Sequence, residues 1–136
     1  MELVDNIRTL VYTNVLTKID VLNTNNGSNL LYWSSIYGYY DITKLLIDKF
    51  DLTKIDIMIP NKNGKIALHG ACSRNHLAIV LLLIDKGNLT KKDIMICNNY
   101  SKSSYDVATF ETKMYLQKMC YIEDINDMIY DIVQYI

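Results

Sequence analysis

The chain repeats itself, and the repeat limits its possible folds more than any other property. The pentapeptide Leu-Thr-Lys-Ile-Asp at 16–20 returns unchanged at 52–56, and again as Leu-Thr-Lys-Lys-Asp at 89–93. The copies start 36 and 37 residues apart, and residues 27–63 aligned with 64–100 are identical at 16 of 37 positions. A period of this length indicates a stack of supersecondary units, because one unit cannot bury its apolar face alone.

Within one unit the pattern predicts a turn, a helix, a break and a second helix. The turn is the polar stretch 61–64, the break is 73–75, and the second helix is the apolar run 77–86. The segment 52–59 lengthens the connection to the next unit. It predicts either a turn or a short strand, with Ile57 and Ile59 packed inward.

Residues 63–80 resemble the ankyrin repeat, whose core reads N-G-x-T-P-L-H-x-A-A-x-x-G-H. The match holds at Gly64, Leu68, His69, Ala71 and His76, with Cys72 in a small-residue position and Ala67 where the family prefers proline. The neighbouring units depart from the pattern, and the period exceeds the usual 33 residues of the family. The resemblance implies an all-α ankyrin-repeat solenoid of about three helix-turn-helix repeats with helical caps at both ends.

The predicted solenoid is a single domain of five segments. They are an N-terminal cap (1–26), a repeat (27–63), a second repeat (64–100), a degenerate repeat (101–122) and a C-terminal capping helix (123–136). In the first cap, a helix over 2–15 carries an apolar stripe. The stripe consists of Leu3, Ile7, Leu10, Val11 and Val15.

The C-terminal helix is the most regular in the sequence. Its apolar residues recur at helical spacing, and Asp124 stands where it could cap the helix. These apolar residues are Ile125, Met128, Ile129, Ile132, Val133 and Ile136. The plainer interpretation is a cap that folds onto the third repeat, and the alternative is a self-association surface.

Composition excludes several classes of function. The chain has 14 basic and 15 acidic residues, so it lacks the clustered positive charge that nucleic-acid binding requires. It shows no signal peptide and no membrane span. The three cysteines form no CxxC pair and are expected to be buried thiols in a reducing, intracellular compartment, the cytoplasm or nucleus. The abundance of Ile, Asn, Lys and Tyr, residues with A/T-rich codons, suggests a large DNA virus, an A/T-rich parasite or protist, or a bacterium of similar composition as the source.

Catalytic and metal chemistry have little basis in the sequence. His69, Cys72 and His76 have a spacing that zinc ligands could use, but the repeat pattern already explains all three and no fourth ligand is evident. A nucleophilic Cys72 would need an exposed thiol near positive charge. No phosphate-binding loop or nucleophile motif occurs, so we expect no enzyme activity, no metal and no cofactor.

The resemblance implies a protein-binding function through the concave groove of the stack. The groove residues, carried over by position, are Ser28, Ile36 and Tyr37, then Lys62, Lys65, Ser73 and Arg74, then Asn99, Lys102, Phe110 and Glu111, with Trp33 beside them. Trp33, Tyr37 and Arg74 are of hot-spot types, although Trp33 could equally pack between repeats. The basic residues either face an acidic partner or are solvated separately.

The sequence therefore predicts a non-catalytic module that binds an unidentified partner protein. Its codon bias suggests a viral or parasite protein that targets a host regulatory protein. A monomer is expected rather than a homodimer. The alternative is a self-associating structural subunit that uses the C-terminal helix.

Overall fold

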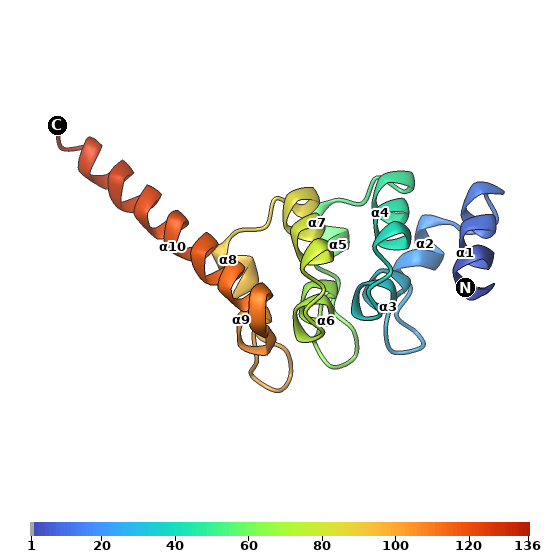
Figure 1. Ribbon diagram of the computed structural model, residues 1–136. Helices are drawn as coiled ribbons and strands as arrows, with labels where there is room; N and C mark the ends of the chain where they lie inside the picture. Colours follow the sequence, from blue (N-terminus) through green and yellow to red (C-terminus); the bar gives the residue numbers. More distant parts are fainter. Residues whose placement is uncertain (1) are drawn as a thin grey trace.

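The computed structural model describes residues 2–136, and this part of the chain is a stack of helices in two rows joined by single helical turns (Figure 1). The outer row holds α1 (Glu2–Tyr12), α4 (Tyr40–Lys49), α7 (Leu77–Gly87) and α10 (Phe110–Val133); the inner row holds α3 (Leu30–Ile36), α6 (Ala67–Ser73) and α9 (Ser104–Val107); the connecting turns are α2 (Lys18–Leu22), α5 (Lys54–Ile57) and α8 (Lys91–Ile94). The only β pairing described in residues 2–136 is an isolated bridge between Cys97 and Ser103. The predicted all-α solenoid is confirmed.

The two helices of a repeat form where the sequence predicts them. The inner helix α6 is built of small and apolar residues that are all buried up to Cys72, and it ends where Asn75 adopts a left-handed φ of 56°. Asparagine tolerates this conformation better than most residues, so it stops the helix without a glycine. The chain then reverses into α7, whose Ile79, Val80 and Leu83 are fully buried. The reversal packs α7 beside α6 within one repeat.

The lengthened connections are single turns of helix. In α5 and α8 the threonine before the helix and the aspartate three residues later form a capping box, as Thr17 and Asp20 do in α2. Of the two alternatives, the turn is therefore confirmed and the short strand is wrong. Ile57 is buried as expected, whereas Ile59 is only half-buried.

The repeated Thr-Lys-x-Asp sequence also joins one repeat to the next. The Nζ atom of Lys18 lies 3.0 Å from the carboxylate of Asp56, and that of Lys54 lies 2.8 Å from Asp93. Burial by itself would raise the pKa of Asp56, but hydrogen bonds from Thr53 and Lys18 outweigh it and lower the pKa. Each aspartate thus caps its own turn and receives the lysine of the preceding repeat.

This series of ion pairs, the lysine ladder, ends on α10. The Nζ atom of Lys91 lies 2.7 Å from the carboxylate of Asp124, and its backbone N–H donates to Glu123 at 2.8 Å. Asp124 therefore lies within a helix and takes the last lysine of the ladder. The expectation that Asp124 caps a separate helix is wrong.

The C-terminal helix is longer and more exposed than the sequence suggests. Residues 123–136 do not form a separate cap, because α10 runs without a break from Phe110 to Val133. Only Thr112 and Leu116 of α10 are buried. Beyond Ile125 every residue is exposed, and this end projects away from the stack (Figure 1). The prediction that the apolar stripe folds onto the third repeat is wrong.

The N-terminal helix is a partial cap. It ends at Tyr12, and only Ile7 and Val11 of its predicted stripe are buried, against α4 and α2. Leu3, Leu10 and Val15 are exposed. The stripe is shorter than predicted because residues 13–15 leave the helix, with Asn14 at a left-handed φ of 59°.

The cysteines lie in three different environments. Cys72 is completely buried in the core, Cys120 is half-buried on α10, and Cys97 is exposed; all three are free thiols. The expectation of three buried thiols therefore holds only for Cys72, because only Cys72 lies on an inner helix covered by a repeat on each side.

Candidate functional site

The hairpin tips at 25–29, 61–65 and 98–102 form one continuous rim along the inner helices. Each of the last two tips is held by an asparagine side chain that accepts two backbone N–H groups: Asn61 accepts from Asn63 and Lys65, and Asn98 accepts from Tyr100 and Lys102. The same asparagines also donate their backbone N–H groups across the tip, Asn61 to Lys65 and Asn98 to Lys102, both at 2.8 Å. The tips are therefore ordered without a sheet.

Backbone hydrogen bonds join each tip to the next. The N–H of Lys62 donates to the carbonyl of Gly27 at 3.0 Å, and the N–H of Asn99 donates to that of Asn63 at 2.9 Å. Gly64 has φ +74°, and a Cβ there would lie 2.5 Å from the Asn99 side-chain oxygen. Glycine is thus required at this contact, both for its φ and for the close approach.

His69 ties the inner helix to the tip of the following repeat. Its Nδ1 accepts the N–H of Ile66 at 3.2 Å, and its Nε2 donates to the carbonyl of Lys102 at 3.0 Å. Burial lowers the pKa of His69, and this arrangement needs the neutral imidazole, since Nδ1 must accept. Both ring nitrogens make hydrogen bonds within the chain. The geometry therefore supports the predicted role of His69 as a hydrogen-bonding residue of the inner helix.

His76 links neighbouring repeats in a second way. It precedes α7, as predicted for the break between helices, and its Nε2 donates to the carbonyl of Ile36 at 3.1 Å. In Cys72, burial raises the pKa of the thiol to about 12, the opposite of what a nucleophile requires. No group of three His, Cys, Asp or Glu side chains within residues 2–136 is arranged to hold a metal ion.

The predicted groove residues divide into two sets in the structure. One set lies at the hairpin tips, where Ser28 accepts a hydrogen bond from Asn61 and Asn99 donates to the carbonyl of Lys62. These two side chains are engaged between tips. The lysines of the same set have ammonium groups that enter no ion pair of residues 2–136, and Lys65 lies over the ring of Tyr100 at 5.5 Å. The lysines of this set are Lys62, Lys65 and Lys102.

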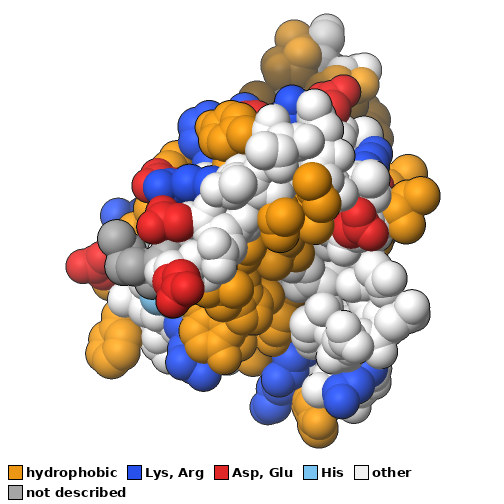
Figure 2. Space-filling model, turned by 90° about the vertical axis from the view of Figure 1, so that its right-hand side faces the viewer, with side chains coloured by type: hydrophobic (Ala, Val, Ile, Leu, Met, Phe, Trp, Pro, Cys, Tyr) orange, Lys and Arg blue, Asp and Glu red, His pale blue; other side chains and the backbone are white. Residues whose placement is uncertain are grey.

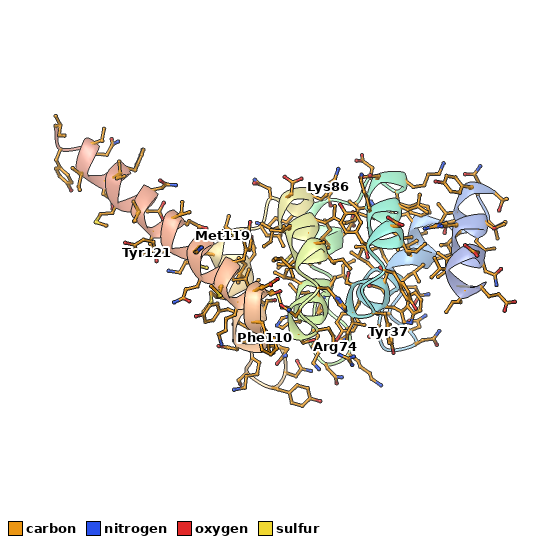
Figure 3. The ribbon with its side chains drawn as sticks, in the orientation of Figure 1. Tyr37, Arg74, Lys86, Phe110, Met119 and Tyr121 are labelled. Atoms are coloured by element: carbon orange, nitrogen blue, oxygen red, sulfur yellow. The ribbon has the colours of Figure 1, made fainter. Side chains whose placement is uncertain are left out.

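The other set lies where the chain passes from an inner helix to the following outer helix. Tyr37, Arg74 and Phe110 follow one another along the lower edge of the stack (Figure 3), and Tyr37 and Phe110 are 57% and 79% exposed. Phe110 holds a left-handed φ of 48°, which non-glycine residues rarely adopt. Ile36 is half-buried, whereas Ser73 and Glu111 are exposed. We call the two sets together the hairpin edge.

Trp33 belongs to an aromatic cluster at the N-terminal end of the hairpin edge. Its ring centroid lies 5.5 Å from that of Tyr37 and 5.2 Å from that of Tyr39, and its side chain is half-buried. The half-buried ring of Trp33 therefore packs against the exposed ring of Tyr37. Tyr39 and Tyr100 were not among the groove residues predicted from the sequence. The one signal for them was their position in the sequence, within two residues of the predicted groove residues Tyr37, Asn99 and Lys102.

The positive charge of the hairpin edge is unpaired within residues 2–136. Five lysines elsewhere in the stack, 18, 44, 54, 86 and 91, form ion pairs, whereas the basic side chains of the hairpin edge form none. Glu111 is the acidic residue among the predicted groove residues. The edge thus presents cations and exposed aromatic rings from a rigid backbone.

Comparison with known proteins relates the chain to one family. The model of three ankyrin repeats matches residues 3–93. Among solved structures, the crystal structure of the ankyrin repeat domain of Bcl-3, described as a unique member of the IkappaB protein family, superposes with a TM-score of 0.62 at 19% identity. The match covers 82% of this chain and 44% of that chain, so this chain spans less than half of its length. No curated protein sequence matches significantly.

These matches bear on fold and family. At 19% identity the Bcl-3 domain shows the shared fold alone. Neither match supports the viral or parasite source suggested by the codon bias. No helix within residues 2–136 combines the length and the apolar character needed to cross a membrane. Ankyrin repeats are in general non-catalytic modules that bind other proteins, and with two thirds of its length matched by the family model the chain belongs to the ankyrin-repeat family.

Proposed function

We propose that the chain binds a partner protein through the hairpin edge, and that the partner presents an acidic segment. The observation that carries the proposal is the row formed by Tyr37 and Arg74, which follow the inner helices α3 and α6, and by Phe110, the first residue of α10 (Figure 3). Tyrosine and arginine are the types enriched at interface hot spots. Because hydrogen bonds between the tips fix the backbone, binding here loses little conformational entropy.

Charge supports the acidic character of the partner. The cations Lys62, Lys65, Arg74 and Lys102 take no part in the ion pairs described for residues 2–136, so a partner carboxylate would displace no carboxylate of this chain. Complementary charge of this kind speeds association and selects the partner. The free thiols favour a reducing compartment, and we place the interaction inside the cell.

The test is affinity capture with matched charge reversals. Arg74→Glu reverses a cation of the hairpin edge, and Lys49→Glu reverses an exposed lysine on the outer helix α4 that also enters no ion pair described for residues 2–136. A protein retained by the wild type and by Lys49→Glu, but lost with Arg74→Glu and with Tyr37→Ala, supports the proposal. Equal retention by all four chains contradicts it.

A second candidate function, self-association, is favoured by the exposed side of α10. Met114, Tyr121 and Met128 recur every seven residues along α10, the spacing of a coiled-coil seam, and each is more than half exposed. The acidic end of α10 carries Asp127 and Asp131, so antiparallel pairing with a second copy would bring them near the lysines of its first half. A helix end of this length without tertiary contacts is marginal in water.

The oligomeric state separates the two candidates. Light scattering after size exclusion, across a wide concentration range, is expected to show a monomer if the hairpin edge is the main binding surface. A dimer that Ile129→Asp and Ile132→Asp dissociate supports self-association instead. A dimer that survives both substitutions contradicts the role given to α10.

A further inference from the structure

The end of the stack formed by α1, α2 and α3 contains a hollow of about 400 Å³. In Figure 2, which faces this end, apolar side chains gather in a depression between flanking polar groups. The apolar walls are Leu3 and Ile7 from α1 and Leu30 and Trp33 from α3. The polar lining residues are Asp20, Asn23, Asn26, Ser28 and Asn29, of which Asp20 is the charged one. The hollow adjoins the hairpin edge at two lining residues, Ser28 and Trp33.

The repeat explains why the hollow exists. The inner helix α3 packs against two helices, the outer helix α4 of its own repeat and the next inner helix α6. One repeat earlier in the sequence, the equivalents of α4 and α6 are α1 and α3, and the hollow lies between them. The hollow is therefore at the position that an inner helix takes elsewhere in the stack. An inner helix from a further ankyrin repeat is accordingly the first occupant to consider.

Trp33 makes that occupant a poor fit. The equivalent residue of α6 is Gly70, where a Cβ would lie 3.1 Å from the Cβ of Ile36 and 3.3 Å from the ring of Tyr32. Inner helices thus approach each other so closely that this position has almost no room for a side chain. An indole at the same position of α3 keeps another helix backbone at a distance. The hollow is shaped for side chains that reach in from a partner.

Asp20 is the charged residue of the hollow. It accepts hydrogen bonds from the N–H and hydroxyl of Thr17, as Asp56 does from Thr53 and Asp93 from Thr90. Asp56 and Asp93 each also bind the lysine of the preceding repeat. Asp20 is exposed, and among the ion pairs of residues 2–136 no lysine reaches it. It is the open end of the lysine ladder.

We propose that the hollow binds a protein segment in which a large apolar side chain stands beside a lysine or arginine. The apolar side chain packs against Leu3, Ile7 and Trp33, and the cation takes the place at Asp20 that Lys18 takes at Asp56. Charge disfavours the α10 end of a second copy as the occupant, because residues 119–136 contain acidic residues and no lysine or arginine. The hollow meets the hairpin edge at Ser28 and Trp33, but none of the cations of the hairpin edge lines it, and the two surfaces would select partners of opposite charge.

Trp33 offers a direct measurement, since it is the only tryptophan in the chain. The probe is an end-capped synthetic peptide, Ser-Leu-Leu-Lys-Ser, titrated against the full chain while the fluorescence of Trp33 is followed. The matched probe has glutamate in place of lysine. A saturable change is expected with the lysine peptide, at least about twofold tighter than with the glutamate peptide. No saturable change up to the solubility limit, or equal affinity for both peptides, overturns the proposal.

Variants locate the binding. Asp20→Asn keeps a side-chain oxygen that can accept from Thr17, and it is expected to weaken the lysine peptide about two- to fivefold. The glutamate peptide, no longer facing a like charge, is expected to bind equally well or slightly more tightly. Leu3→Ser is expected to weaken both peptides. Asp41→Asn, which removes an exposed carboxylate paired with Arg8, is the matched control and is expected to change nothing. If Arg74→Glu tightens the lysine peptide as strongly as Asp20→Asn weakens it, the peptide binds the hairpin edge and the proposal is overturned.

Discussion

The outer helices α7 and α10 occupy equivalent places in successive repeats, yet they are buried very differently. In α7, Ile79, Val80 and Leu83 are completely buried. Their equivalents on α10 are Leu116, which is buried, Gln117, which is exposed, and Cys120, which is half-buried. The difference shows that a second helix gains most of its core from the repeat that follows it. On α10, which no further repeat covers within residues 2–136, two of these positions are taken by a polar and a small residue.

Removing the side chain of Leu83 is expected to have the largest effect on stability. Leu83→Ala leaves a cavity in the main core, and such changes cost about 2–5 kcal/mol. Ile129→Ala on the exposed half of α10 is expected to change the free energy of unfolding by less than about 0.5 kcal/mol. Urea unfolding followed by circular dichroism measures both. Similar losses for the two variants would mean that α10 is covered in solution.

Loss of His69 comes next. His69→Ala leaves the N–H of Ile66 and the carbonyl of Lys102 without their partner, and we expect a loss of roughly 2–4 kcal/mol in the free energy of unfolding. The same unfolding experiment applies, with Ser73→Ala at the exposed end of the same helix as control. An effect no larger than that of the control would show that the bridge to the next repeat is not maintained.

The lysine ladder predicts a smaller difference between its middle and its open end. Asp56→Asn weakens a cap and leaves Lys18 without its partner, so we expect a loss of about 1–2 kcal/mol. Asp20→Asn is expected to destabilise the chain less, because no lysine described in residues 2–136 binds Asp20. Thermal unfolding of the two variants at low salt gives the order. The reverse order would contradict a ladder that joins repeats.

Stability is also expected to depend on pH through His69. Because burial lowers its pKa in the folded chain, the unfolded chain binds a proton first as the pH falls. The contribution is fully present above the unfolded pKa, near 6.5, and is lost progressively as the pH decreases below it. Comparing unfolding at pH 7.5 and pH 5.5 for the wild type and His69→Gln checks this. A pH dependence that is unchanged in the variant would assign it to other groups.

Shortening α10 is expected to have the smallest effect. A chain that ends at Ile125 loses only exposed residues, so its melting temperature should equal that of the full chain. A chain that ends at Lys118 also loses Glu123 and Asp124, the end of the lysine ladder, and should melt lower. Differential scanning calorimetry at several protein concentrations tests both. A lower, concentration-dependent melting temperature for the first truncation would instead support pairing through α10.

Parts of the site were predictable because they repeat. The positions of Tyr37, Arg74 and Glu111 follow from the 37-residue offset, and the structure places Tyr37 and Arg74 on one edge with Phe110. The support of Tyr37 by Trp33 and Tyr39 was not predictable, because ring stacking depends on how the turn after α3 orients the side chains. Likewise, Ser28 and Asn99 resemble free groove residues in sequence but bond to neighbouring tips.

The sequence alone determined the helical repeat, its period and its breaks, because these depend on residues that are close along the chain. The contacts between repeats are seen only in the tertiary structure. There, Lys18 pairs with Asp56, and α10 continues past the third repeat with its apolar side exposed. There too, Trp33 occupies the position at which Gly70 of the next repeat lets an inner helix approach closely. Contacts between repeats depend on the spacing and rotation of stacked units, which no local pattern encodes.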